Sequence, residues 1–470
     1  METISYLNLS VDGTPITKIV SLSIQHAINQ HATAELVGEA PLSAAGDFAK
    51  RCDETTKITI TTKASGQPAV IFCGLVASVG VEKQETYGLV KLSLKSTSFL
   101  LDTEKKNKSF QNTGKTYEQI LKEAYGSQAN LTMNVSDKAI GSIVMQYSET
   151  NWEFTRRIAA IFNAPVFANV DTEKPNITIG LPSSGKSYTL KDVEYDYAST
   201  LGGGTSIKTQ QYMYLGDKVS YGGQTERVKQ LSATIVSGIL TTTVAVAQDS
   251  GFEAQHSLMS AGTGAISGGE ALGSGTNGVG VTTNAAVSGK MFTGIVQAVQ
   301  KDKVQVHLVD IDAEYDGGGD YWFPYSTAYS SSDGSGFYCM PEEGDTVRVF
   351  FPSGKEGEAF AASSVNVSPL DNPKHKKWRS PAGKEILMTE EGIFITCKEN
   401  KIFINLANED GITISCDKDI NICSKTNISV MANEKMVLQA DNNIIISTAE
   451  SYIDMKPDKI EVGAVNVTIA

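Results

Sequence analysis

The chain has 470 residues, of which 41% are hydrophobic and 20% charged, a composition typical of folded domains rather than of disordered chains. Its 53 acidic residues outnumber its 40 Lys and Arg, and the net charge of −13 disfavours nonspecific binding to nucleic acid and to anionic membrane surfaces. The start of the chain lacks the basic and apolar regions of a signal peptide, so we expect synthesis in the cytoplasm without a signal peptide.

Strand patterns, in which short apolar runs lie between turn signals, dominate the first hundred residues. Two amphipathic helices follow. The first begins after Thr116, and Gln119 completes a capping box with it. The second begins after Thr150, with Glu153 at the same position of a second box. The apolar stripes of both helices predict core packing rather than binding surfaces.

A change in composition marks the end of this first domain. Residues 254–289 contain nine glycines and a single charged side chain, Glu270, which indicates a flexible linker. We therefore assign residues 1–285 to the first domain, including this linker. Residues 286–370 contain about five short strand patterns, which predict a small closed barrel of the OB type.

Residues 371–470 carry an eight-residue repeat. Each repeat has two apolar residues separated by one position, followed by polar turn residues. Fifteen of the 16 positions in this frame are apolar, and Asp454 is the exception. The predicted inward residues of the repeat are Ile404, Leu406, Ile412, Ile414, Ile420, Ile422, Ile428, Val430, Met436, Leu438, Ile444, Ile446, Ile460 and Val462.

Such an octad is too short to close one turn of a single-chain β-solenoid, which typically needs about 20 residues. The missing faces are expected to come from identical copies, since every octad has the same unmet apolar stripe. The repeat therefore predicts an intertwined triple-stranded β-helix in which every strand pairs with another chain. An antiparallel meander of short strands is the alternative. Asp454 is expected to form a water-filled or ion-bound triplet on the threefold axis.

One segment matches a nucleotide-binding motif. Gly180–Ser187 fits the pattern G-x4-G-K-[ST], which needs a helix that begins at its lysine, Lys186. The following residues, 188–197, instead alternate like a strand. We therefore interpret the segment as a hairpin turn rich in Pro, Gly and Ser, and expect no nucleotide site.

Other signals of chemistry are weak. The chain has no G-x-S-x-G, HExxH or His-x-His motif, and its six cysteines form no CxxC pair and no cluster with zinc spacing. The paired carboxylates Glu342-Glu343 and Glu390-Glu391 are predicted to be solvated turn residues. We expect reduced, buried thiols, no catalytic or cofactor-binding residues, no metal, and no enzymatic activity.

The order of a strand-rich domain with two helices, a small barrel and an octad-repeat tail resembles the VgrG family. These are the fused hub-and-spike proteins of type VI secretion systems, contractile phage tails and related injection particles. The resemblance spans essentially the whole chain. Besides the octad, it rests on Glu149–Ala159, Leu215–Val219, Trp322, Pro341–Val347 and, more weakly, Ser363–Val367.

The resemblance implies a homotrimer that serves as the hub and spike of a contractile machine. Its first domain would cap the inner tube and meet baseplate proteins, residues 286–370 would form the neck, and residues 371–470 the needle. The particle would puncture a target envelope on contraction, leave the cell, and carry effectors. Only about 15 residues separate barrel and needle, and the chain ends after the repeat, so neither an inserted lysozyme domain nor a terminal effector domain is expected.

The family also implies a partner at the tip, a separately encoded conical protein of the PAAR type. Its predicted docking residues are Ala464, Val465, Asn466, Val467, Thr468, Ile469 and Ala470. The stretch contains no histidine, so no metal is expected there. Two alternatives come from other classes of protein. A trimeric phage-type receptor-binding fibre would carry a head after the repeat, and a β-helical polysaccharide-degrading enzyme would show a longer repeat and a carboxylate cluster.

Overall fold

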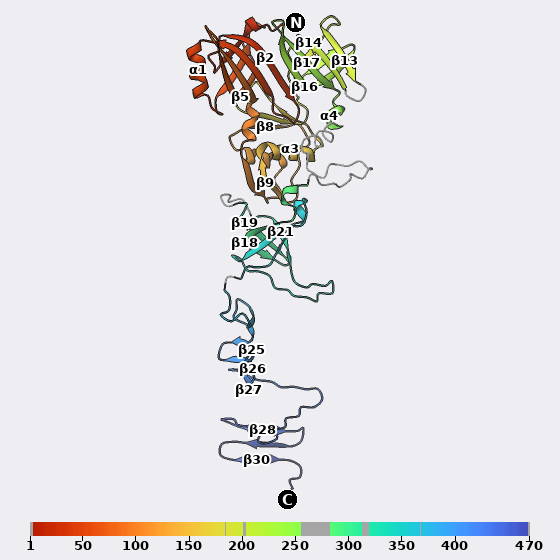
Figure 1. Cartoon of the computed structure of the whole chain (residues 1–470). Helices are drawn as coiled ribbons and strands as arrows, with labels where there is room; N and C mark the ends of the chain where they lie inside the picture. Colours follow the sequence, from red (N-terminus) through yellow and green to blue (C-terminus); the bar gives the residue numbers. More distant parts are fainter. Residues whose placement is uncertain are drawn as a thin grey trace. The chain divides into compact units, whose positions relative to one another are not determined.

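The computed structural model describes residues 3–183, 185–200, 204–254, 283–312, 319–366 and 368–468 (Figure 1). The chain divides into two compact units, a first unit (Met1–Val365) and a repeat unit (Asn366–Ala470). None of the helices among the described residues has both the length and the apolar character needed to cross a bilayer. Most of the predicted Gly-rich linker lies outside the described residues.

A 12-stranded sheet forms the largest part of the first unit. Ten of its strands lie in the spatial order β1 (Leu9–Asp12), β4 (Lys57–Thr62), β5 (Ala69–Lys83), β6 (Gly88–Ser96), β3 (Thr33–Ala40), β2 (Lys18–Ala27), β16 (Gln224–Val236), β17 (Ile239–Ala247), β14 (Gly204–Thr209) and β13 (Tyr195–Thr200). The other two are β15 (Lys218–Tyr221), which pairs with β16, and β12 (Ser187–Thr189), which pairs with β15. Neighbours far apart in sequence, such as β2 and β16, join its two halves.

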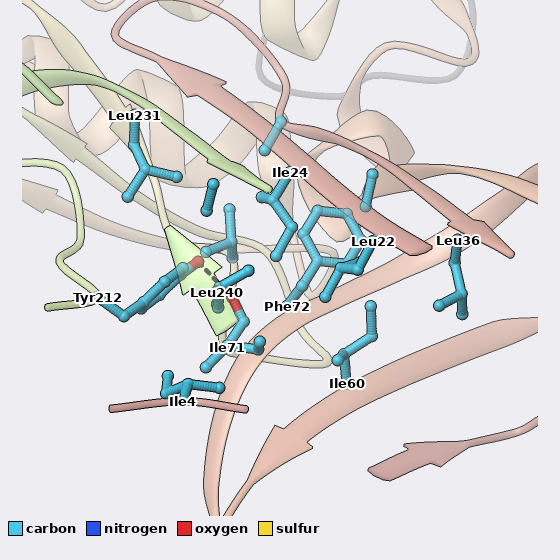
Figure 2. Packing of buried hydrophobic residues seen from close by; sticks show 14 of the residues in the cluster. Ile4, Leu22, Ile24, Leu36, Ile60, Ile71, Phe72, Tyr212, Leu231 and Leu240 are labelled. Atoms are coloured by element: carbon cyan, nitrogen blue, oxygen red, sulfur yellow. Dashed lines mark hydrogen bonds between the residues drawn. The ribbon is translucent and has the colours of Figure 1, made fainter. Parts of the chain in front are cut away.

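Apolar side chains from both halves of this sheet meet in one cluster. Figure 2 shows Leu22 and Ile24 of β2 close to Phe72 of β5, and Leu231 of β16 belongs to the same cluster. The hydroxyl of buried Tyr212 donates a hydrogen bond to the carbonyl of Ile71 over 2.9 Å, drawn as a dashed line in Figure 2. Burial raises the pKa of Tyr212, so this hydroxyl stays protonated and available as a donor.

The two predicted helices are confirmed as α2 (Tyr117–Tyr125) and α3 (Asn151–Ile161). At the start of α2 the Thr116 hydroxyl accepts a hydrogen bond from the Gln119 backbone N–H. In return, the Gln119 side-chain oxygen accepts one from the Thr116 backbone N–H. Thr150 and Glu153 make the same reciprocal pair at α3. These bonds satisfy amide groups that the first helical turn leaves unpaired, so local sequence alone fixes both starts.

The helix α1 (Leu42–Arg51) was not predicted, since the first hundred residues were assigned to strands. Its N-cap is Pro41, which offers no side-chain bond, and Gly46 lies inside it. Both features weaken the sequence signal of a helix. Packing of Ala45 and Phe48 in the core of the 12-stranded sheet supports α1 instead. A short fourth helix, α4 (Ser250–Ala254), follows β17.

Two small sheets contact α2 and α3. One pairs β7 (Lys105–Phe110) with β9 (Val144–Thr150), and the other has the order β10 (Val166–Ala168), β11 (Asn176–Ile179), β8 (Asn130–Met133). Short 3-10 turns complete the first unit: η1 (Tyr6–Asn8), η2 (Thr97–Leu101), η3 (Ala285–Val287) and η4 (Glu356–Glu358).

The predicted OB-type barrel is confirmed. Five strands close in the order β18 (Lys290–Gln300), β19 (Lys303–Leu308), β20 (Trp322–Ser326), β22 (Phe360–Ala362), β21 (Thr346–Phe351), and β21 pairs back with β18. The pairing of β20 with β22 is parallel, while the other pairs are antiparallel. Ile143 and Met145, from the first domain of the sequence analysis, join the barrel's buried core. The barrel therefore packs against the preceding domain within one compact unit.

The repeat unit contains two antiparallel meanders. Their strands are β23 (Lys376–Arg379), β24 (Glu385–Met388), β25 (Gly392–Lys398), β26 (Ile402–Ala407) and β27 (Gly411–Ser415) in one sheet, and β28 (Ile444–Ser447), β29 (Tyr452–Met455) and β30 (Ile460–Gly463) in the other. These strands pair within the chain, whereas we expected every strand to pair with another copy. The polar turns are short enough to return the chain as a hairpin, which satisfies the backbone locally.

The expectation of buried thiols is met in full only by Cys73. Cys73 is buried, and Cys52 and Cys416 are half-buried. The exposed cysteines are Cys339, Cys397 and Cys423. All six are free thiols. Two of the exposed ones lie in the repeat unit, where a single chain is too thin to cover both faces of its sheets.

Candidate functional site

The first meander of the repeat unit presents one apolar face. Residues directly opposite each other on antiparallel strands share a face, so the strand register defines its rows. One row is Trp378, Ile386, Ile395, Ile404 and Ile414, and the next is Met388, Ile393, Leu406 and Ile412. Four predicted inward residues of the octad therefore lie side by side on this face.

This apolar face is open in the single chain. Ile412 is 71% exposed and Ile414 58%, and a cavity of about 690 Å³ lies beside Trp378, Ile395 and Ile404. Exposed apolar surface that is contiguous across several strands is typical of an interaction surface. We name these two rows the apolar ladder.

The eight-residue frame of the sequence analysis did not include the residues of the apolar ladder on β23, β24 and β25. Ile386, Ile395 and Ile404 are spaced by nine residues rather than eight. One residue of β25, Cys397, is skipped in the pairing with β26, and this irregularity between Thr396 and Lys398 accounts for the longer step from Ile395 to Ile404. A search for nine-residue as well as eight-residue steps would have found these positions.

The central octads form no cluster in the chain. No strand is assigned to residues 416–443, all of which the structure describes, and residues 417–443 are all exposed. The predicted inward residues here are between 49% and 73% exposed: Ile420, Ile422, Ile428, Val430, Met436 and Leu438. This segment therefore has both apolar side chains and backbone groups without a partner strand.

The second meander gathers the last four predicted inward residues, with a change of frame in its middle strand. Its apolar face consists of Ile444, Ile446, Ile453, Met455, Ile460 and Val462. The octad frame instead placed Tyr452 and Asp454 inward. The turn before β29 is one residue longer than the frame assumes and the turn after it one shorter, so β29 faces the other way.

Within the chain Asp454 is therefore on the face opposite these apolar residues, which disfavours the expected carboxylate triplet on the axis. It lies opposite Glu461 on β30, and its carboxylate is 3.2 Å from the Lys456 Nζ. Lys456 also contacts Glu461, and Lys459 contacts Glu461 over 2.5 Å. Two lysines thus offset two carboxylates, which explains how an acidic residue is tolerated in the repeat.

The predicted tip residues follow β30, which is an edge strand of its sheet. No strand is assigned to Ala464–Thr468. Val465 is 84% exposed and Val467 56% exposed. Ile469 and Ala470 lie outside the described residues.

A buried charge cluster connects α3 to the barrel. The Arg157 guanidinium donates two hydrogen bonds to Glu149, at 2.7 and 2.9 Å, and one to the Met145 carbonyl at 2.5 Å. It also lies 3.5 Å from Glu356 of η4, beside the barrel strand β22. Glu356 accepts hydrogen bonds from the Met145 N–H and the Asn284 amide. Burial raises the pKa of Glu356, although Arg157 opposes this shift.

A second buried contact joins β7 to the barrel. Asp312 accepts hydrogen bonds from the Ser109 N–H at 2.7 Å and from its hydroxyl at 2.5 Å. Gln111 donates to Ser109 and to the carbonyl of Val306 in β19. Burial raises the pKa of Asp312, and the bonds from Ser109 oppose that shift. Sequence reasoning missed both buried contacts, although Glu149 and Arg157 lie within a stretch that carried the resemblance.

The segment Gly180–Ser187 does not form a nucleotide site of the expected kind. Strand β12 follows it rather than a helix, so no set of helix N-terminal amides faces a phosphate position. The backbone N–H of Lys186 instead donates to the Asp217 carboxylate over 2.7 Å. The hairpin interpretation is wrong in detail, because the segment connects β11 of one sheet to β12 of another.

The other stretches of the resemblance have structural roles. Asp217 also accepts the backbone N–H of Tyr214, and Gly216 has a positive φ of 84° that favours glycine. In the barrel, Gly344 has a φ of 89° and the Asp345 carboxylate accepts the Glu342 N–H over 2.9 Å. These stretches are therefore turns that place strands β15 and β21.

Comparisons with known proteins agree with this architecture. Residues 42–161, from the start of α1 to the end of α3, match the family model described as phage tail baseplate hub (GPD). No curated protein sequence matches the chain. The E. coli c3393 protein, described as a component of the type VI secretion system similar to the T4 tail proteins gp27 and gp5, has 12% identity and a TM-score of 0.51. That match covers 76% of this chain and 99% of c3393.

The chain has a VgrG-like fold. A chain of the Francisella PdpA–VgrG complex matches it with 9% identity and a TM-score of 0.50, over 88% of this chain and 87% of that one. These similarities are to structural hub and spike proteins of contractile systems rather than to enzymes.

Proposed function

We propose that this protein is the homotrimeric hub and spike of a contractile injection particle, in which it punctures a target envelope and carries a tip protein or effectors. The observation that supports the proposal most strongly is the apolar ladder. Together with the exposed apolar residues of 416–443, it forms a stripe that one chain leaves uncovered. Two further copies would bury that stripe and would pair the free backbone of the central octads.

The buried contacts between the barrel and the preceding domain support a mechanical role. Arg157 and Asp312 join elements that lie far apart in the sequence through bonds shielded from water. Such charge-assisted bonds keep a defined geometry under load better than a flexible linker would. The proposal therefore assigns force transmission between the hub and the barrel to these contacts.

The mass of the full chain in solution tests the trimer. Static light scattering should give about 150 kDa, three times the chain mass of 50.3 kDa. The variant Ile414→Asp should be monomeric, because assembly would bury three carboxylates together in an apolar core. Its control is Thr413→Asp, since Thr413 lies opposite Asn405 on the other face of the same strand. A monomeric wild type, or a trimeric Ile414→Asp, would contradict the proposal.

The tip residues are proposed to bind a small PAAR-type protein. The support is the edge strand β30 and the exposed Val465 and Val467 beyond it, which offer a backbone edge and apolar side chains for strand addition. A pull-down should recover the tip protein with the full trimer and lose it with a trimer truncated after Val462. Equal recovery by both would place the docking surface elsewhere.

A further inference from the structure

Three side chains that can ligate a metal meet near the first strands of the repeat unit. His375 precedes β23, and Glu390 and Glu391 form the turn between β24 and β25. One ligand atom from each lies within 4.8 Å of those of the other two. The His375 Nε2 is 2.9 Å from a Glu390 carboxylate oxygen. In the sequence the histidine and the glutamates are 15 residues apart, and the pairing of Lys376 with Met388 brings them together.

The turn that carries the two carboxylates is held in place. The Asn408 backbone N–H donates to the Glu391 carbonyl over 2.8 Å, and its side chain donates to the Glu390 carbonyl over 2.7 Å. A Cβ at Gly392 would lie 2.2 Å from the Leu406 carbonyl oxygen, so the chain fits closely against β26. A turn fixed in this way presents its side chains with little further ordering, which favours binding of a ligand.

We propose that His375, Glu390 and Glu391 bind a divalent transition-metal ion, for which zinc has the best matching chemistry. Zinc accepts one imidazole nitrogen with two carboxylate oxygens, whereas calcium and magnesium prefer all-oxygen sets. Donors about 2.1 Å from a tetrahedral zinc lie about 3.4 Å apart, so rotation of the glutamate side chains closes the present spread. Three protein ligands leave the fourth position to water.

The ion would act as a clip. It would tie the segment that leads into β23 to the turn between β24 and β25, and would replace the direct contact between His375 and Glu390. The Asn372 side-chain Nδ2 already lies 3.4 Å from a carboxylate oxygen of Glu390. Binding to the folded chain alone stabilises the fold by mass action. The strands that begin the apolar ladder would then be anchored independently of trimer formation.

Calorimetric titration of the full-length, untagged, chelator-treated protein with zinc chloride tests the site. We expect one ion per chain, and binding at least tenfold weaker in His375→Gln and Glu390→Gln. The glutamine variants keep side-chain volume and hydrogen bonding, and circular dichroism checks their folding. The matched control is Glu342→Gln, in the barrel's own Glu-Glu-Gly turn, which holds no histidine. It should bind zinc as the wild type does.

Cobalt provides a direct spectroscopic readout of the same site. Wild-type protein loaded with cobalt should show visible d–d absorption that His375→Gln lacks. Equal zinc affinity in wild type and His375→Gln, or no zinc binding by the wild type, would overturn the proposal. Either result would leave His375 and Glu390 as an ordinary side-chain contact on the surface. Neither result bears on the trimer, which is measured separately by light scattering.

Discussion

The buried cluster at Arg157 is expected to contribute strongly to the stability of the contact between the barrel and the preceding domain. Replacing Arg157 by methionine keeps much of the side-chain volume but removes the cation. Glu149 and Glu356 are then left buried without their partner, since their side chains are only 14% and 10% exposed. Leaving a buried charge unpaired typically costs about 3–5 kcal/mol.

The expected loss can be traced to individual contacts. Arg157 makes three hydrogen bonds within 3 Å and one longer ion pair, and the methionine makes none of them. At about 2 °C per kcal/mol, the thermal midpoint of the first unit should fall by roughly 6–10 °C. Since burial raises the pKa of Glu356, its ionised form is costly, and stability falls as pH rises through its folded pKa.

A double-mutant cycle that combines Arg157→Met with Glu356→Gln measures the coupling free energy between these two residues. The glutamine keeps an oxygen that accepts from Met145 and Asn284 but removes the stranded charge. The double variant should therefore be more stable than the sum of the single losses predicts, with a coupling energy of about 1–3 kcal/mol. The exposed pair Lys122 and Glu118 on α2, at 2.7 Å, is the control and should couple by less than about 0.5 kcal/mol. Additive losses at Arg157 and Glu356 would refute the reasoning.

Three further predictions concern single residues. Ile453→Asp should weaken the trimer in light scattering while Asp454→Asn leaves it intact, and the reverse result would restore the strict octad frame. Burial lowers the pKa of His26 from 6.5 to about 3, so the folded state binds fewer protons than the unfolded state between these values. The free energy of unfolding in urea should therefore fall as the pH drops below 6.5, by up to about 1.4 kcal/mol per pH unit. His26→Leu should not show this loss. An equal loss in both proteins would contradict this assignment. Calorimetry should detect no ATP binding by the wild type, and binding that Lys186→Ala abolishes would revive a nucleotide site.

Local sequence was enough to predict the features whose interactions are local. The capping boxes at Thr116 and Thr150 are complete within four residues, so both helix starts could be read from the sequence. The alternation of Ile404, Leu406, Ile412 and Ile414 placed them on one face, because a strand turns successive side chains to opposite sides. The barrel followed from the number and spacing of its strands.

Other features depend on which distant segments the fold brings together. The helix α1 has no cap of its own and is supported by the sheet behind it. The frame of β29 is set by the lengths of its two turns, and a shift of one residue exchanges Asp454 for Ile453 on the apolar face. Repeat counting alone does not detect such a shift.

Charged groups show most clearly the difference between features set by local sequence and features set by the tertiary fold. As sequence, Glu390-Glu391 and Glu342-Glu343 are equivalent pairs before a glycine, and Arg157 is one of two adjacent arginines in a helix. The sequence by itself determined the helices α2 and α3, the barrel and the apolar repeat. Only the tertiary structure placed His375 beside one glutamate pair and Glu356 beside Arg157. The physical reason is that capping and periodicity act within a few residues, whereas charge partners are set by burial and distance between segments far apart in the chain.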